Sequence, residues 1–133
     1  MKTIDVELLN RVSAQAKAAE RLRMNYNFHE SLEDKCHRML NAVEPGTVVP
    51  IHRHPTKDES FVILRGKVRV TTHNDDGFII EDVVLSQESG NYGVDIPKNV
   101  WHKGKGEMKE ERVELFEKLL DLCGEYRRVN QYK

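Results

Sequence analysis

Residues 36–102 contain a series of short runs rich in Val, Ile, Phe and Thr, each followed by residues that favour turns. The runs are CHRMLNAV, TVVPI, SFVILRGKVRVTT, GFIIEDVVL and YGVDI, and the segments between them include EPG, HNDDG, SQESG and PKN. β-Branched and aromatic residues favour strands, whereas Gly, Pro, Asn and Asp favour the bends that separate strands. Gly66 and the pair Asp76-Gly77 stand where the chain must reverse direction. The pattern predicts a β-sandwich or a small barrel.

Both ends of the chain have a different pattern. In IDVELLNRVSAQAKAAE the apolar residues recur at helical spacing, and Thr3 or Asp5 is placed to cap the first turn, which predicts a helix from about residue 5 to about 20. RLRMNYNFHE follows neither period, and we expect an ordered loop or a short extended piece there. EMKEERVELFEKLLDLCG carries an apolar helical stripe that ends at Gly124 and predicts a helix over about 107–124. The alternative is that RVELFEK forms a final strand.

The segment PIHRHPTKDE, residues 50–59, carries two histidines one residue apart and a carboxylate five residues after the second. Alternate residues of a strand face the same side, so His52 and His54 project together. Glu59 opens the next apolar run in register with Phe61 and Ile63, so it is an inward carboxylate at the rim if that face lines the interior of a barrel. A buried carboxylate is costly unless it is paired or bound to a metal.

His102 is a fourth candidate, because it follows IPKNVW, where a strand ends in a proline turn. Imidazole nitrogens together with one carboxylate form a ligand set for divalent transition metals. The same residue types also occur on exposed strands without any metal. The spacing of His52, His54 and Glu59 alone therefore leaves two interpretations open, a metal site or a chance feature of surface composition.

Composition excludes several classes of protein. The chain has 133 residues, enough for one domain with its own core, and 21 Lys and Arg against 22 Asp and Glu give a net charge of −1. No nucleic-acid or membrane partner is expected from that balance. Cys36 and Cys123 form no CxxC pair, and MKTIDVELLN lacks the apolar run of a secretory signal, which predicts a cytoplasmic protein with reduced thiols. No P-loop, GxGxxG or GxSxG motif is present.

The spacing of these residues resembles the cupin superfamily. The first cupin motif, G-x5-HxH-x3–4-E-x6-G, is matched at every fixed position by Gly46, His52, His54, Glu59 and Gly66. The second motif, G-x5-PxG-x2-H-x3-N, is matched at its proline and its histidine.

In that second motif Pro97 and His102 have the expected separation, but Asn99 replaces the central glycine. Gly90 lies one residue too far upstream, and Gly106 stands in place of the final asparagine. Asn tolerates left-handed geometry, so the turn can form without glycine.

RMNYNFHE, LNAVEPGTVVPIHRHP and GNYGVDIPKNVWH further resemble the WbuC family of cupin-fold metalloproteins, which is found among bacterial genes for O-antigen and other surface polysaccharides. The resemblance implies a mainly β protein with a single cupin domain over residues 1–133. In this domain a jelly-roll barrel (a double-stranded β-helix) over about 36–106 is flanked by the two helices. The resemblance to the cupins makes His52, His54, Glu59 and His102 the ligands of a divalent Fe, Mn, Ni, Co or Zn ion. After His102 the chain departs from the family ending, because VELFEKLLDLCGEYRRVNQYK replaces a short Gly-Pro-Tyr terminus.

The family has no settled reaction, so the resemblance implies a fold and a metal more than a substrate. One hypothesis is a metal-dependent enzyme, an isomerase, an epimerase or an oxygenase-type cupin, that acts on a sugar or nucleotide-sugar intermediate of surface polysaccharide biosynthesis. Tyr92 and His29 lie in the family-like segments and are the candidate catalytic acid or base. The alternative is a non-catalytic module that binds a small sugar-like molecule, with RLRMN and Arg38 contacting a phosphate or carboxylate. Because cupins pair through sheet edges or terminal strands, we expect a homodimer.

Overall fold

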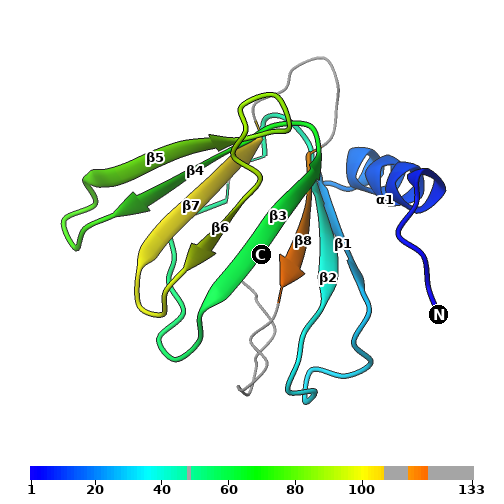
Figure 1. The fold of residues 1–133 in the computed structure, drawn as a ribbon, viewed down its shortest axis with the longest axis horizontal. Coiled ribbons are helices and arrows are strands. Elements are labelled where there is room, and N and C mark those ends of the chain that lie inside the picture. The colour runs from blue at the N-terminus through cyan, green and yellow to red at the C-terminus, as the bar shows by residue number, and fades with distance from the viewer. Residues whose placement is uncertain (48, 107–113, 120–133) are drawn as a thin grey trace.

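The computed structural model describes residues 1–47, 49–106 and 114–119, which form one helix and eight strands (Figure 1). The helix is α1 (Val6–Ala18). The strands are β1 (Arg23–Asn27), β2 (Met39–Val43), β3 (Glu59–Arg65), β4 (Val68–His73), β5 (Ile79–Leu85), β6 (Gly93–Ile96), β7 (Trp101–Gly106) and β8 (Glu114–Leu119). The protein is therefore mainly β with an N-terminal helix, as the sequence predicts.

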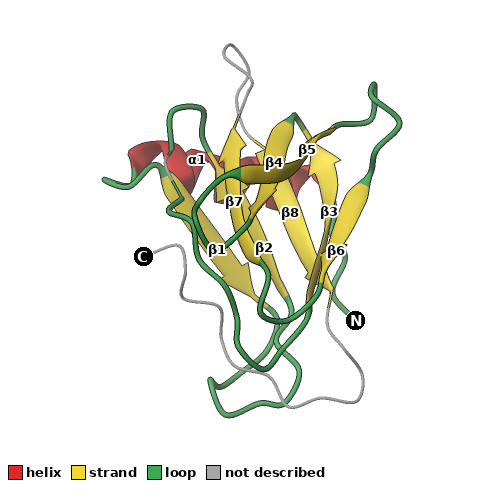
Figure 2. Ribbon diagram, turned by 90° about the vertical axis from the view of Figure 1, so that its left-hand side faces the viewer, coloured by secondary structure: helices red, strands yellow, loops and turns green. Residues whose placement is uncertain are grey.

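The strands form two antiparallel sheets that lie face to face (Figures 1 and 2). One sheet has five strands in the order β1-β2-β8-β3-β6, and the other has three in the order β5-β4-β7. Because β8 pairs with both β2 and β3, it joins the first strands of the barrel to the strand that begins at Glu59.

An apolar core fills the space between the sheets. It contains Phe61 and Ile63 from β3, Val68 and Val70 from β4, and residues from β2, β5 and β6. In β3 the burial alternates, with Glu59, Phe61 and Ile63 buried and their neighbours more exposed. The period of two therefore assigns the interior face of this strand.

Helix α1 covers the outer face of the five-stranded sheet at β1 and β2. Its buried side includes Leu8, Val12 and Ala16, which pack with Leu40 and Ala42 of β2. Because the other face of β2 contacts the barrel core through Val43, all five residues of this strand are buried. The Asp5 side chain accepts a hydrogen bond of 2.9 Å from the Leu8 N–H, so Asp5 is the N-cap.

The glycine turns are as expected. Gly66 joins β3 to β4 and Gly77 joins β4 to β5, with φ of 86° and 89° respectively. These φ angles favour glycine because it has no Cβ. Part of RLRMNYNFHE, expected as a loop or a short extended piece, forms the regular strand β1.

The predicted C-terminal helix over about 107–124 is wrong for residues 114–119. This segment is strand β8, which pairs with β2 and β3, so the alternative of a final strand is correct there. The rest of the predicted helix, 107–113 and 120–124, lies outside the described residues. The pairing explains the error, because neighbouring strands override a helical pattern in the local sequence.

Among the described residues, no helix is long and apolar enough to cross a membrane; α1 has 13 residues.

Gly93 provides a test of how tightly β6 packs on β3. A Cβ at this position would lie 2.6 Å from the Phe61 carbonyl oxygen and 2.9 Å from the Val62 Cγ1. We expect Gly93→Ala to lower the free energy of unfolding by about 1–3 kcal/mol, since the backbone must shift to admit the methyl group. Urea denaturation monitored by circular dichroism measures the change.

Gly104→Ala is the matched control, because a Cβ there meets no atom within 4 Å. It should leave stability unchanged or raise it slightly through the unfolded state. Equal stability of the two variants would contradict close packing between β3 and β6.

Candidate metal centre

The two histidines of the HxH segment are held by backbone hydrogen bonds to the chain around β7. His52 forms an isolated antiparallel bridge with His102: each N–H donates to the other residue's carbonyl, over 3.0 and 2.9 Å. The carbonyl of His54 accepts a hydrogen bond of 2.7 Å from the Asn99 N–H. These three bonds align residues about 50 positions apart in sequence.

Asn99 occupies the turn that leads into β7. Its φ is 71°, the left-handed region, so asparagine takes the role that glycine has in the cupin motif. The Asp58 carboxylate accepts a hydrogen bond of 2.8 Å from the Lys98 N–H and ties the same turn to the start of β3. The turn therefore forms despite the missing glycine.

Glu59 is the first residue of β3 and lies opposite Ile96 of β6. Its side chain points to the barrel interior on the same face as Phe61 and Ile63, and it is only 1% exposed. Apolar neighbours on this face give the carboxylate little solvation, so its charge needs a partner inside the protein.

The structure brings all four predicted ligands together. His52, His54, Glu59 and His102 each offer one ligand atom, and these atoms lie within 4.8 Å of one another. Two ligands on opposite sides of a metal ion are about 4.2 Å apart when each bond is about 2.1 Å, so the cluster is close to the size of a metal site.

Hydrogen bonds assign the protons on two of the imidazoles. Nδ1 of His52 lies 2.8 Å from the Pro50 carbonyl oxygen, and Nδ1 of His102 lies 2.9 Å from the Val100 carbonyl oxygen. A carbonyl oxygen only accepts, so each Nδ1 must donate. In the neutral ring the lone pair is then on Nε2, as a metal ligand requires.

The Nε2 atom of His102 lies 2.9 Å from Glu59 Oε1, and the Nε2 of His54 lies 3.3 Å from the same oxygen. With Nδ1 of His102 donating to Val100, a neutral His102 would direct a lone pair at a carboxylate oxygen. Two acceptors at this distance repel each other unless a proton or a metal cation lies between them. The donor set therefore fits a cation.

The pKa of His52 is lowered from 6.5 to about 4, mainly by burial and also by the nearby His102, while Pro50 and Glu59 act in the opposite direction. The ring is consequently neutral at physiological pH and available as a ligand. His54 is only partly buried, with 14% of its side chain exposed, whereas Glu59 and His102 lie deeper. The cluster is therefore accessible from the side of His52 and His54.

The structure does not bring Tyr92, the first catalytic candidate, into the cluster. The carbonyl of Tyr92 accepts a hydrogen bond from the N–H of Ile63, and its side chain is 59% exposed. Ile63 is four residues beyond Glu59 on β3, a distance of about 13 Å along a strand. Tyr92 thus lies toward the far end of β3.

His29, the second candidate, lies in the connection between β1 and β2, at the same end of the sheet as Glu59. Met39, which begins β2, and Phe61 both pair with Lys118 of β8, which fixes this relation. The His29 side chain is 6% exposed and stacks on His37 at 4.2 Å between ring centroids. Its Nδ1 accepts a hydrogen bond from the Arg38 N–H, and its buried Nε2 has no hydrogen-bond partner among the described residues.

Sequence reasoning missed the supporting groups. His37, buried against His29, gave no periodic signal because it precedes β2 by two residues. The carbonyls of Pro50 and Val100 orient the imidazoles, and backbone groups leave no mark in a sequence. Asp58 was visible as the neighbour of Glu59, but its partner is the N–H of Lys98, 40 residues away.

Comparison with solved structures identifies the fold. A capsular polysaccharide assembling protein, CapF from Staphylococcus aureus, has a TM-score of 0.60 and 22% identity over 76% of this chain and 29% of its own. Oxalate decarboxylase from Bacillus subtilis, whose Mn(II) centres have been studied, has a TM-score of 0.55 and 20% identity over 74% of this chain and 25% of its own. A cupin-2 domain containing protein from Shewanella frigidimarina has a TM-score of 0.51 and 18% identity over 73% of this chain and 79% of its own.

These similarities confirm the predicted cupin fold. The chain spans only about a quarter of the length of the first two proteins. The sequence has no significant match among curated proteins.

A family described as Domain of unknown function (DUF6016) matches residues 4–85, from the residue before the N-cap of α1 to the end of β5. Three of the four clustered residues lie in the matched region and His102 lies beyond it, and the chain belongs to this family.

Proposed function

We propose that this protein is a metal-binding cupin whose divalent transition-metal ion is held by His52, His54, Glu59 and His102. The observation that carries the proposal is the contact of 2.9 Å between Nε2 of His102 and Oε1 of Glu59. Because Nδ1 of His102 donates to a carbonyl, both facing atoms are acceptors in the neutral state. A metal ion satisfies both of them and also the Nε2 atoms of His52 and His54.

Three imidazoles and one carboxylate suit Fe(II), Mn(II), Ni(II), Co(II) and Zn(II). Four protein ligands leave about two positions of a six-coordinate ion for water or a ligand. When bound, the ion would polarise a carbonyl or hydroxyl oxygen of that ligand.

A cavity of about 410 Å³ between β4, β5 and β6 is the candidate space for a small molecule. Its lining includes Ile96, which pairs with Glu59, and Thr72, which pairs with His102, so it adjoins the cluster. Glu81 and Asp95 also line it, and each already accepts a hydrogen bond from a hydroxyl, of Thr72 and Ser60 respectively. Hydroxyl-accepting carboxylates beside an apolar wall suit a polyhydroxylated ligand such as a sugar.

The proposed activity is metal-dependent conversion of a sugar or nucleotide-sugar intermediate of surface polysaccharide, by isomerisation, epimerisation or oxidation. The fold it shares with the capsular polysaccharide assembling protein supports this direction. The alternative is a non-catalytic module that binds the same class of molecule. Membership of the WbuC family, a homodimer and a cytoplasmic location stay predictions.

The protein's own residues have clear roles in this proposal. The carbonyls of Pro50 and Val100 hold the tautomers of His52 and His102, so that both Nε2 atoms face the ion. Burial of Glu59 keeps water from competing for its oxygens. His29 is the candidate proton donor or acceptor, because its buried Nε2 has no other hydrogen-bond partner in the described chain.

Metal content tests the proposal. The purified protein, reconstituted with Mn(II), Co(II) or Zn(II), should hold about one ion per chain by elemental analysis, and His54→Ala or Glu59→Gln should lose most of it. At a free metal concentration 100 times the Kd, binding contributes about 2.7 kcal/mol to the stability of the wild type, which raises Tm by roughly 10 °C.

His73→Gln is the matched control, since His73 is a buried histidine that lies outside the cluster. Its ring contacts Thr71 and Gly77 instead. It should keep the full metal content. A folded wild type that holds far less than one ion after reconstitution would refute the proposed centre.

The low pKa of His52 predicts how the stability of the metal-free protein depends on pH. The unfolded chain binds a proton at His52 below about pH 6.5, whereas the folded protein does so only near pH 4. The contribution of His52 to stability is therefore complete above pH 6.5 and is lost as the pH falls toward 4. Urea denaturation of metal-free protein at pH 7.0, 5.5 and 4.5 measures it.

His52→Gln should show a shallower loss of stability than the wild type over that range. Identical pH dependence of the two proteins would mean that the ring of His52 is not desolvated as the fold implies. Protein chelated and dialysed beforehand is required, because bound metal would hide the proton equilibrium.

Turnover distinguishes the enzyme from the binding module. A panel of hexoses, sugar phosphates and nucleotide sugars is incubated with metal-loaded protein and analysed by NMR. Conversion that disappears in His54→Ala, and falls in His29→Gln while metal content is kept, is the expected result. Ligand-induced thermal stabilisation without product from any compound would favour the binding module instead.

A further inference from the structure

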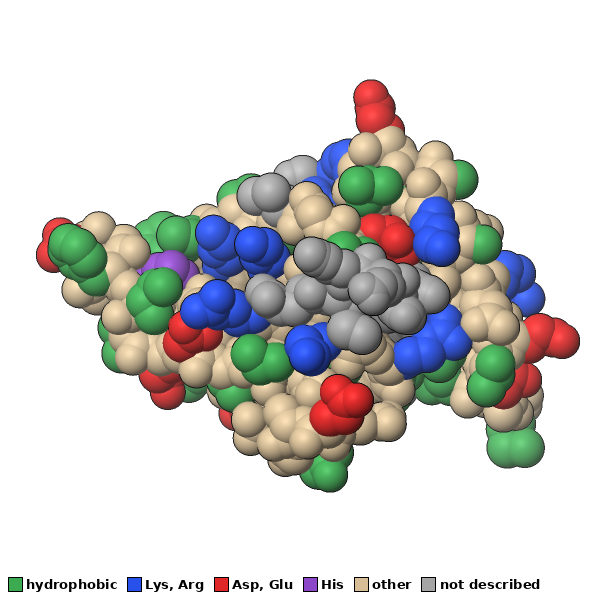
Figure 3. Space-filling model, turned by 90° about the horizontal axis from the view of Figure 1, so that it is seen from above, with side chains coloured by type: hydrophobic (Ala, Val, Ile, Leu, Met, Phe, Trp, Pro, Cys, Tyr) green, Lys and Arg blue, Asp and Glu red, His purple; other side chains and the backbone are tan. Residues whose placement is uncertain are grey.

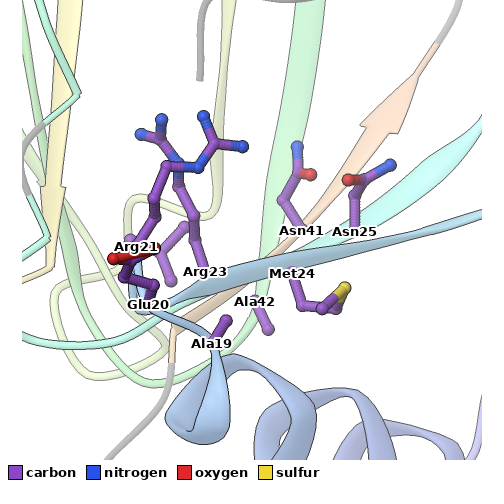
Figure 4. A pocket seen from close by; sticks show the side chains of 9 residues that line it. Ala19, Glu20, Arg21, Arg23, Met24, Asn25, Asn41 and Ala42 are labelled. Atoms are coloured by element: carbon purple, nitrogen blue, oxygen red, sulfur yellow. The ribbon is translucent and has the colours of Figure 1, made fainter. Parts of the chain in front are cut away.

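A second polar cavity, of about 310 Å³, lies at the start of β1, away from the clustered histidines. Arg21, Arg23, Asn25 and Asn41 line it together with apolar residues and Glu20. Figure 4 shows these four side chains on one side of the strands, while Met24 and Ala42 point toward helix α1.

Asn41 is the strongest sign that the cavity takes a ligand. The residue is only 6% exposed, and it lines the cavity. Neither polar atom of its carboxamide is among the described side-chain atoms that are fully buried and unpaired, so the carboxamide is open to the cavity, where a ligand can bond to it. Asn41 sits in the middle of β2, on a strand whose other residues are all buried.

The arginines add positive charge to this carboxamide. The guanidinium group of Arg21 forms no ion pair or hydrogen bond with a described residue, and Glu20 beside it forms none either. A guanidinium group has five N–H donors and no acceptor, so its natural partners are phosphate and carboxylate oxygens. Two arginines and the amide of Asn41 thus present donors to the same cavity.

Asn25 adds a hydrogen-bond acceptor to the donors of the arginines. Its amide nitrogen donates one of its two hydrogens to Oδ1 of Asn27 over 2.7 Å, so one N–H and the carbonyl oxygen, an acceptor, remain for the cavity. A ligand that uses all of these groups needs anionic oxygens for the arginines and hydroxyl groups for Asn25 and Asn41. A small phosphorylated polyhydroxy compound has both, and the cavity volume suits a molecule of that size.

The backbone between the arginines is fixed rather than loose. Leu22 has a φ of 57°, a left-handed geometry that non-glycine residues adopt only when their surroundings hold them there. Its N–H donates to Ala19, and its carbonyl accepts hydrogen bonds from the Glu44 N–H and from the Thr47 hydroxyl, over 3.0 and 2.8 Å. Contacts 25 residues apart therefore determine where Arg21 and Arg23 leave the chain.

Charge on the surrounding surface agrees with an anionic ligand. Figure 3 looks down on the end of the barrel where β1 begins, and Lys and Arg side chains lie around the middle of that face, with Asp and Glu side chains among and outside them. These basic side chains are exposed there although the whole chain has a net charge of −1. Exposed Lys and Arg side chains attract anions from solution.

We propose that this cavity is an anion site for a small phosphorylated compound, separate from the metal centre. Asn41, Ile63 and Glu59 share one face of the sheet, because Asn41 and Ile63 both pair with Phe116 and Glu59 lies four residues before Ile63. Four residues along the strand and two strands across give a separation of roughly 16 Å from Asn41 to Glu59. One phosphate therefore does not reach both sites.

Isothermal titration calorimetry of the full-length, metal-loaded protein at low salt tests the site, with inorganic phosphate, glucose 6-phosphate and glucose as probes. Glucose 6-phosphate should bind more tightly than phosphate, and glucose should not bind. Arg21→Gln and Arg23→Gln should each weaken glucose 6-phosphate binding about tenfold or more, because each removes a charged hydrogen bond. Arg11→Gln, the same change on the exposed side of α1, should leave the affinity unchanged.

Asn41→Leu separates a ligand group from a structural one. It should lose glucose 6-phosphate binding while Tm stays the same or rises, because an apolar side chain replaces an amide that faces the cavity. A large fall in Tm would show that Asn41 supports the fold and would overturn its assignment to the ligand.

The metal centre provides the last control. His54→Ala should keep the affinity for glucose 6-phosphate while it loses metal. If His54→Ala abolishes phosphate binding, the anion binds at the metal and the separate site is refuted, although the metal proposal stands. Absence of saturable binding to folded wild type, or full affinity in the Arg21→Gln/Arg23→Gln double variant, would equally refute it.

Discussion

The carboxylate of Glu59, buried inside the barrel against imidazole nitrogens, is the constraint on which the rest of the site depends. At 1% exposure it has lost its water, and the apolar side chains of Phe61 and Ile63 beside it offer no hydrogen bonds. The Nε2 atoms of His54 and His102 approach the same oxygen to 3.3 and 2.9 Å, so a cation held between them and the carboxylate would compensate for the lost water. Removing a partner from a buried charge costs far more than the pair contributes, so the three side chains must be positioned together.

The backbone provides that positioning without a contribution from the side chains of the site. The His52–His102 bridge and the Asn99 to His54 hydrogen bond attach the HxH segment to the start of β7, and the Glu59–Ile96 pair attaches β3 to β6. Both attachments use main-chain groups, which substitution of a ligand leaves in place. A substitution at a ligand position is therefore expected to abolish metal binding while the barrel stays folded. Metal binding and folding can consequently be measured separately in such a variant.

The sequence predicts the part of the site that is local. His52, His54 and Glu59 follow from the period of two and from short spacing, and the resemblance to the cupins supplies His102 from a distance. The role of Asn99 was also visible, because asparagine is one of the few residues that adopts φ of 71° at low cost. Helix α1 was predictable to within about two residues at each end, since its cap and its apolar face lie within one segment.

Features that depend on partners far away in the chain were not predictable. β8 has a helical pattern in its sequence, but pairing with β2 and β3 makes it a strand. β1 gave no clear period because its side chains are half-buried on both faces, under α1 on one side and beside a cavity on the other. The left-handed turn at Leu22 comes from hydrogen bonds to Glu44 and Thr47, so nothing in RLRMN itself indicates where its two arginines point.

The same sheet face therefore carries apolar side chains and two polar regions. The histidine cluster lies toward the start of β3, whereas Asn41 lies level with Ile63, two strands away, and borders the cavity that the arginines line. Helix α1 compensates for the polar residue in the second region. It buries Leu40 and Ala42 on the outer face of the sheet and so anchors β2 without help from the side chain of Asn41. Because β2 is anchored from behind, its inner face is free to hold a polar group, and the chain can keep a carboxamide where packing alone would select leucine or valine.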